Sequence, residues 1–168
     1  MHKSIANLSF IKDQIKTKFS LIDHPKIIAV SKTFPMTEIE PLLKHGHHHF
    51  GENKIQEAIN KWTNVKNDFE NVKLHMIGKL QSNKAKFLLP LFDYLHSLDN
   101  IKLAEKISNE QQKQKKRIKI FIQVNIGNEL QKNGIQLNEL ENFYNICMNK
   151  LDLNIIGLMC LPPDKEDA

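Results

Sequence analysis

One lysine of this chain stands where the surrounding sequence predicts the end of a buried strand. Lys32 follows the apolar run K-I-I-A-V-S and precedes T-F-P. Desolvation at such a strand end disfavours the charged form of an amine, and a neutral amine is a nucleophile. A lysine of this kind condenses with an aldehyde or a ketone. The alternative is a lysine that leads out of the strand into solvent, and spacing alone favours this alternative.

Two asparagines end other apolar runs. Asn53 follows F-G-E, and Asn125 follows the run K-I-F-I-Q-V. An asparagine amide offers both a donor and an acceptor to a ligand, and Gly51 permits close approach of the backbone. Both asparagines are therefore candidates for ligand binding.

His75 and Ile77 lie two residues apart in the run L-H-M-I-G. In a strand they share one face, and Met76 between them takes the other. His75 then either belongs to a site or is a core histidine bonded to a neighbour. In the polar loop that follows, Ser82 is the expected cap of the next helix.

Four histidines, at positions 45, 47, 48 and 49, raise the question of a metal site. Adjacent side chains of an extended segment point to opposite faces, so consecutive histidines cannot all face one ion. Cys147 and Cys160 have no metal-type spacing and are expected to be two buried thiols. We therefore expect no metal site.

Strand-like and helix-like segments alternate along the chain. The strand-like runs are 26–31, 48–52, 74–78, 94–98, 119–126 and 154–161. Helical periodicity precedes the first run and fills the intervals, with further caps expected at Thr37 and Asp99. This order predicts right-handed β-α-β units and a parallel sheet. Because no glycine-rich phosphate loop follows any strand, and polar residues gather at several strand ends, a β/α barrel is favoured over an open sheet.

The bulk composition indicates one domain, residues 1–168, of an ordinary globular protein. The net charge is +5, but the lysines are scattered, which does not favour a nucleic-acid partner. The sequence contains no secretory signal and no apolar run long enough for a membrane span. With two cysteines expected to be free thiols, a cytoplasmic location is expected.

Several motifs resemble the pyridoxal phosphate homeostasis protein family, which is itself similar to the barrel domain of alanine racemase. In order, they are A-V-S-K-T, F-G-E-N, H-x-I-G-x-L-Q-x-N-K, H-S-L-D, Q-V-N-I, K-x-G and G-L-M. The resemblance runs from about residue 5 to the C-terminus. It implies an α/β fold, a (β/α) TIM-type barrel of the alanine racemase N-terminal type.

The resemblance also implies a cofactor, pyridoxal 5′-phosphate, bound as an aldimine of Lys32. The other residues that it places around the cofactor are Asn53, His75, Ile77, Asn125, Lys132 and Met159. Members of the family are known as carriers that buffer the cofactor rather than as catalysts. Their candidate partners are the apo-enzymes that use the cofactor.

The family pattern continues beyond what these 168 residues contain. It implies two further strands with a Ser-Met-Gly-Met-Ser segment and a Val-Arg-Ile-Gly segment, which hold the phosphate and the pyridine nitrogen. We therefore expect an incomplete barrel, with about six of eight strands, that retains the cofactor weakly. The alternatives are a racemase-like enzyme that acts on amino acids and a non-functional fragment.

Overall fold

Six parallel strands form one sheet in the order of the sequence, β1-β2-β3-β4-β5-β6. The computed structural model describes residues 2–18, 25–127 and 133–161. The strands are β1 (Ala29–Val30), β2 (His49–Glu52), β3 (Lys73–Met76), β4 (Tyr94–Leu98), β5 (Lys119–Val124) and β6 (Asn154–Cys160). Each strand pairs in parallel with the next one along the chain. This topology confirms the predicted α/β fold and is that of a partial TIM-type barrel.

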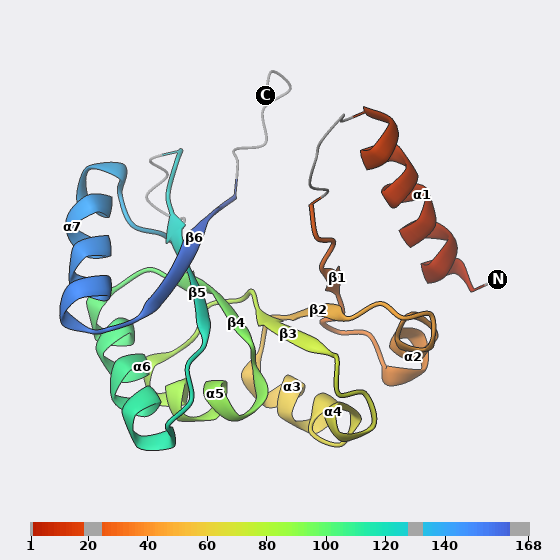
Figure 1. Cartoon of the computed structure of the whole chain (residues 1–168), viewed down its shortest axis with the longest axis horizontal. Coiled ribbons are helices and arrows are strands. Elements are labelled where there is room, and N and C mark those ends of the chain that lie inside the picture. The colour runs from red at the N-terminus through yellow and green to blue at the C-terminus, as the bar shows by residue number, and fades with distance from the viewer. Residues whose placement is uncertain (1, 19–24, 128–132, 162–168) are drawn as a thin grey trace.

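Apart from α1, which precedes β1, the helical segments connect the strands and lie around the outside of the curved sheet (Figure 1). They are α1 (Lys3–Lys18), α2 (Met36–Lys44), α3 (Ile55–Trp62), α4 (Val65–Asp68), the 3₁₀ helix η1 (Ser82–Phe87), α5 (Leu88–Leu91), α6 (Ile101–Gln114), the 3₁₀ helix η2 (Leu137–Glu139), α7 (Leu140–Asn145) and the π-helical turn η3 (Ile146–Lys150). Among the described residues, none of these helices is long and apolar enough to cross a lipid bilayer.

The main core lies between the sheet and these helices. Strand register aligns Phe50 with Leu74 and Leu95 with Ile120, and all four side chains are fully buried. Trp62 at the end of α3 is also fully buried, and its ring packs 5.0 Å from that of Phe50. Aromatic burial of this kind is one of the larger single contributions to a core. We call this the outer face of the sheet, and the opposite one the inner face.

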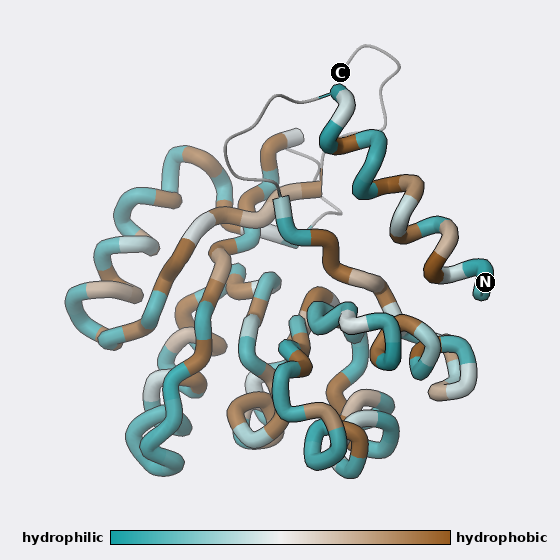
Figure 2. Tube along the Cα trace, turned by 45° about the vertical axis from the view of Figure 1, so that its right-hand side comes forward, coloured by the Kyte–Doolittle hydropathy of each residue, from teal (hydrophilic) through white to brown (hydrophobic). Residues whose placement is uncertain are grey.

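The hydropathy of the trace follows the same division (Figure 2). Apolar residues recur along the strands and along the sides of the helices that meet them, whereas the outward sides of the helices are hydrophilic. On α3 the buried residues are Ile55, Ala58 and Trp62, at the spacing of one helical face. Helix α1 differs, because Leu8 is its one fully buried residue and Phe10 is 64% exposed.

Several expected helix ends are displaced by one or two residues. The helix after β4 is capped by Asn100, whose Oδ1 accepts a hydrogen bond from Leu103 N–H at 2.9 Å, and not by Asp99. Gln81 rather than Ser82 precedes η1, and Pro35 rather than Thr37 precedes α2. Asp99 and Asn100 are both capable caps, and the packed helix selects Asn100, whereas Pro35 and Gln81 make no side-chain capping hydrogen bond.

Two expectations about individual side chains are corrected. Cys147 is buried, as expected, but Cys160 is exposed because it lies on β6, an edge of the described sheet. Helical spacing predicts that Tyr144 packs on the same face as Leu140 and Cys147, but Tyr144 is 42% exposed on α7.

Strand β6 carries apolar side chains that solvent reaches. Ile156 and Leu158 are 43% and 56% exposed, and only β5 pairs with β6 within the described sheet. An apolar strand with an unpaired edge is a template for association with another chain. This part of the molecule is therefore where self-association should begin.

We expect Leu158→Lys to reduce self-association, because a charge on an edge strand opposes pairing with another strand. Leu137→Lys is the matched control, since Leu137 is 58% exposed but lies on η2. Sedimentation velocity over a concentration series measures the effect. If both variants and the parent chain self-associated equally, a role for β6 in self-association would be contradicted.

Candidate functional site

Lys32 lies directly after β1, at the carboxyl edge of the sheet. The ladder between β1 and β2 extends to Ser31, whose N–H donates to Gly51 O at 2.9 Å. The Ser31 side chain points to the outer face, where its hydroxyl donates to Glu52 Oε1. Because side chains alternate along a strand, Lys32 leaves toward the inner face. Lys32 is exposed, and within the described residues its ammonium has no hydrogen bond or ion pair.

The chain turns sharply at Lys32. Phe34 N–H donates to Ser31 O at 3.2 Å, which closes a β-turn with Lys32 and Thr33 as its central residues. Thr33 has a φ of +65°, in the left-handed region that a β-branched residue rarely adopts. The backbone at Lys32 is therefore held in a defined and strained conformation.

The backbone after β2 and the backbone after β3 are in close contact at Gly78. Ile77 N–H donates to Glu52 O at 3.0 Å, which extends the ladder beyond both strands. A Cβ on Gly78 would lie 2.3 Å from Asn53 O, so only glycine permits this approach. The Ile77 side chain lies over Gly51, where a Cβ would meet it at 3.0 Å. The predicted residues Asn53 and Ile77 are thus brought together at one point of the carboxyl edge of the sheet, which we call the rim.

Asn125 ends β5 in a similar arrangement. It is buried, with 3% of its surface exposed, and its N–H donates to Ile135 O at 3.0 Å. Gly134 has a φ of +127°, and a Cβ there would lie 2.6 Å from Asn125 N. The segment from Gly134 to Ile135 therefore folds directly back over the end of β5.

Side chains connect the loops beyond β3, β4 and β5. Ser97 Oγ donates to Gly78 O at 2.7 Å. Lys79 Nζ donates to Asn133 Oδ1 at 2.7 Å, and Gln123 Nε2 donates to Asn133 O at 3.2 Å. These bonds hold the rim as one unit from Gly78 to Asn133.

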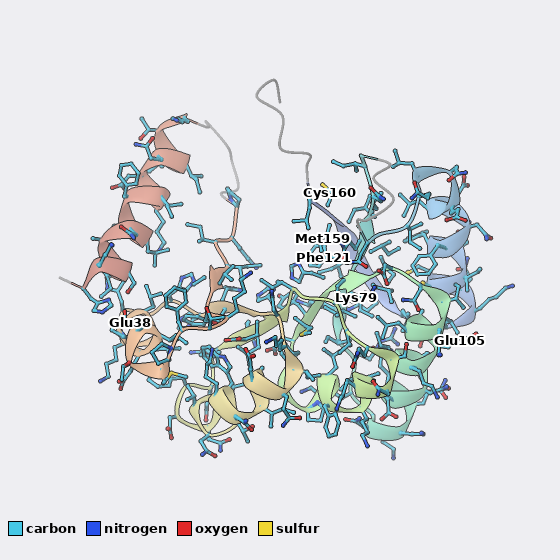
Figure 3. All side chains as sticks on the ribbon, turned by 180° about the vertical axis from the view of Figure 1, so that it is seen from behind. Glu38, Lys79, Glu105, Phe121, Met159 and Cys160 are labelled. Atoms are coloured by element: carbon cyan, nitrogen blue, oxygen red, sulfur yellow. The ribbon has the colours of Figure 1, made fainter. Side chains whose placement is uncertain are left out.

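Met159 lies on β6 opposite Gln123 of β5, and Gly157 lies opposite Phe121. Figure 3 labels Phe121 and Met159 on these two neighbouring strands. Lys32 follows the first strand of the described sheet and Met159 lies on the last, and these two strands do not pair with each other within it. Lys132, the remaining predicted residue, lies outside the described residues.

His75 does not stand alone on the inner face. His49 Nδ1 lies 2.9 Å from His75 Nε2, and His75 Nδ1 lies 2.9 Å from His96 Nε2. Tyr94 stacks on His75 at 4.2 Å, and Phe121 stacks on His96 at 4.4 Å. A hydrogen-bonded chain of three imidazoles thus crosses β2, β3 and β4. A neutral imidazole donates through one nitrogen and accepts through the other, so a neutral His75 can bond to both of its neighbours at once.

Burial explains why these imidazoles stay neutral. It lowers the pKa of His75 to about 3, with further lowering from the neighbouring His96 and His49. Burial also lowers the pKa of His96 to about 4, and that of His49 falls below its usual value for the same reason. The sequence left two alternatives for His75, a site residue or a core histidine bonded to a neighbour. The structure shows His75 bonded to two neighbours below the rim.

The consecutive histidines do not converge on one point. His47 Nε2 bonds to His49 O at 2.9 Å, while His49 joins the imidazole chain. Across the described ranges, no group of three or more His, Cys, Asp or Glu residues is arranged to hold a metal ion.

Sequence reasoning singled out His75 but missed its partners His49 and His96, and it also missed Lys61. His49, His75 and His96 each lie near the middle or start of a strand, and this recurrence in successive strands was a detectable signal. Lys61 on α3 also approaches the site, since its ammonium donates to Ser31 O at 2.8 Å. Nothing in the local sequence distinguishes Lys61 from the other surface lysines, because this contact spans 30 residues.

Sequence comparison identifies known proteins that are similar to this chain. A family profile described as alanine racemase, N-terminal domain, matches residues 6–168. The pyridoxal phosphate homeostasis protein of Pasteurella multocida is 34% identical over 165 residues, which cover 96% of this chain and 71% of that protein.

Solved structures of PipY from Synechococcus elongatus are similar to this chain. The structure without PLP superposes with a TM-score of 0.82 at 31% identity, over 95% of this chain and 71% of PipY. The structure with PLP bound gives a TM-score of 0.78 at 30% identity, over 95% of this chain and 73% of PipY.

We expect Gly78→Ala to destabilise the fold by about 1–3 kcal/mol, the usual cost of overpacking, because its Cβ would collide with the Asn53 backbone. Gly157→Ala is the control, since its Cβ would meet only the ring of Phe121 at 3.1 Å. Urea unfolding compares the two variants. A Gly78→Ala loss no larger than that of the control would contradict the close contact of β2 and β3.

We expect the free energy of unfolding to fall as the pH drops from about 7 toward 4. The pKa values of His75 and His96 in the fold, about 3 and about 4, lie below the 6.5 of an unfolded histidine. The unfolded chain therefore binds more protons in this window, and stability rises with pH through it. Each such proton contributes a slope of about 1.4 kcal/mol per pH unit.

Urea titrations at several pH values measure this slope. His96→Gln should flatten it, because one of the depressed groups is removed. His45→Gln is the control, since His45 is exposed and should leave the slope unchanged. A slope that is the same in all three proteins would show that the imidazole chain is not its source.

Proposed function

Since this chain belongs to the alanine racemase N-terminal domain family and, within it, to the pyridoxal phosphate homeostasis proteins, we propose that it binds pyridoxal 5′-phosphate covalently at Lys32. Its role is that of a carrier that takes up and releases the cofactor. The observation that carries this proposal is the position of Lys32, at the carboxyl end of a parallel strand beside the ends of β2 and β3. Sites in β/α barrels lie at this edge.

The residues of this chain fit the cofactor in two respects. The ammonium of Lys32 is exposed and is not engaged by any described residue, so it is available to an aldehyde. The close contact at Gly78 holds Asn53 at the rim, where a Cβ would leave no space.

When bound, the cofactor would supply an aldehyde that can condense with an amine, with release of one water and no change in oxidation state. For this reaction Lys32 first loses a proton, and its nitrogen then provides the electron pair. Asn53 offers an amide donor and acceptor at the rim. His75 and His96 stay neutral at physiological pH, so they add no positive charge to the inner face.

A carrier is favoured over a racemase-like enzyme by the positions of the tyrosines. The chain has two. Tyr94 begins β4, at the end of the strand opposite the rim, and stacks on His75. Tyr144 is exposed on α7. Neither is placed to act as a base against a ligand held at Lys32, which the racemase reaction would require.

Two further parts of the proposal concern the setting of this activity. Apo-enzymes that use the cofactor are the proposed recipients, because reversible condensation with a lysine permits transfer to another lysine. The cytoplasm is the proposed location, since an exposed free thiol such as Cys160 suits a reducing compartment. Weak retention of the cofactor stays a prediction that the experiment below measures.

We expect pyridoxal 5′-phosphate to give a new absorption band with this protein, and borohydride reduction followed by peptide mass mapping to locate the added mass on Lys32. Lys32→Ala should abolish both signals. Lys26→Ala is the control, since Lys26 is an exposed lysine at the opposite end of the same apolar run. Label spread over several lysines, or unchanged in Lys32→Ala, would overturn the proposal. Titration of the band gives the affinity.

A further inference from the structure

A buried network on the outer face surrounds the residue before Lys32. Glu52 is fully buried, and its Oε1 accepts three hydrogen bonds. The donors are Ser31 Oγ at 2.7 Å, Trp62 Nε1 at 2.9 Å and Lys61 Nζ at 3.0 Å. Lys61 also donates to Ser31 O at 2.8 Å, so one ammonium joins the carboxylate to the backbone.

All three polar groups of Ser31 are therefore fixed. Its N–H bonds to Gly51 O, its hydroxyl bonds to Glu52, and its carbonyl accepts from both Lys61 and Phe34 N–H. The Ser31 carbonyl belongs to the peptide that leads into Lys32. The orientation of that peptide sets the direction in which the Lys32 side chain starts.

The turn that follows needs such support. Thr33 has a φ of +65°, which costs conformational energy for a β-branched residue. A strained conformation persists only where the surrounding structure determines it. β1 itself has two residues and pairs only with β2 in the described sheet, so the ladder alone gives little support.

We propose that Lys61 and Glu52 are a positioning pair, which fixes the β-turn Ser31–Phe34 so that the Lys32 amine meets the aldehyde of pyridoxal 5′-phosphate in a productive orientation. This inference rests on the proposed function of Lys32. The pair acts through the backbone of Ser31 and does not touch the cofactor. A buried ion pair is weak evidence for a role in stability, which is consistent with a role in geometry.

The chain contains a matched control for this pair. Lys66 on α4 donates to Leu91 O at 2.9 Å and to Asp93 Oδ2 at 2.8 Å. Like Lys61, it joins a backbone carbonyl to a carboxylate, and both lysines are largely buried. Its partners precede β4, at the amino-terminal side of the sheet. Loss of Lys66 therefore removes the same kind of interaction far from Lys32.

The first experiment measures the rate at which pyridoxal 5′-phosphate is captured at Lys32 in the full chain. We expect Lys61→Met to slow capture by about tenfold or more, because misplacement of a reacting group by a fraction of an ångström reduces rates on this scale. Lys61→Arg keeps the charge and the donors and should restore most of the rate. Lys66→Met should change it by less than about twofold, since its contacts do not orient a reacting group.

The second experiment needs no cofactor. Hydrogen exchange at the Phe34 amide reports whether the turn is closed, because this N–H bonds to Ser31 O. We expect faster exchange in Lys61→Met, recovery in Lys61→Arg and no change in Lys66→Met. Should Lys61→Met fold poorly, Ser31→Ala replaces it, with Ser108→Ala as its control, since Ser108 Oγ donates to Leu151 O at 2.7 Å.

The outcomes separate this inference from the proposed function. Capture at Lys32 by the parent chain with equal rates in Lys61→Met and Lys66→Met would overturn the positioning pair alone. No capture at Lys32 by the parent chain would overturn the proposed function, and the exchange data would then show only whether Lys61 holds the turn. Equal losses of rate in Lys61→Met and Lys61→Arg would also contradict the inference.

Discussion

The hydrogen bond from Ser31 N–H to Gly51 O is the interaction on which the arrangement of the site depends. It attaches the end of a two-residue strand to the rest of the sheet and brings Lys32 level with the end of β2. Strand register then carries the alignment onward, because Gly51 lies opposite His75 and Ile77 N–H bonds to Glu52 O. Without this first contact, Lys32 would belong to a loose connection rather than to the rim.

The two faces of the sheet carry different kinds of side chain. On the outer face, Phe50, Leu74 and Trp62 bury apolar surface against the helices, and this burial supplies most of the driving force for folding. The inner face is polar and aromatic, with His75 at the centre of a bonded chain. Glu52 is the exception, a charged residue on the outer face, and it is accommodated because Lys61, Trp62 and Ser31 all donate to it.

The sequence predicted those features that depend on short-range pattern. Apolar runs between turn signals located all six strands, and the position of Lys32 followed from the run before it. Features that depend on tertiary contacts were missed. Asp99 and Asn100 are both good caps, and only the packed helix selects Asn100. Lys61 approaches Ser31 across 30 residues, so no local pattern could reveal it. The break of the last helix into 3₁₀, α and π turns likewise has no signal in its apolar spacing.

Trp62 is the single tryptophan of the chain, and its indole N–H bonds to the carboxylate of Glu52, which also accepts from Ser31, the residue before Lys32. The protein thus contains an intrinsic fluorophore that shares a hydrogen-bond acceptor with Ser31. Its emission comes from a fully buried indole beside Phe50, free of interference from other indoles. Its emission is therefore an optical signal for changes around Glu52 and Ser31 that needs no attached dye.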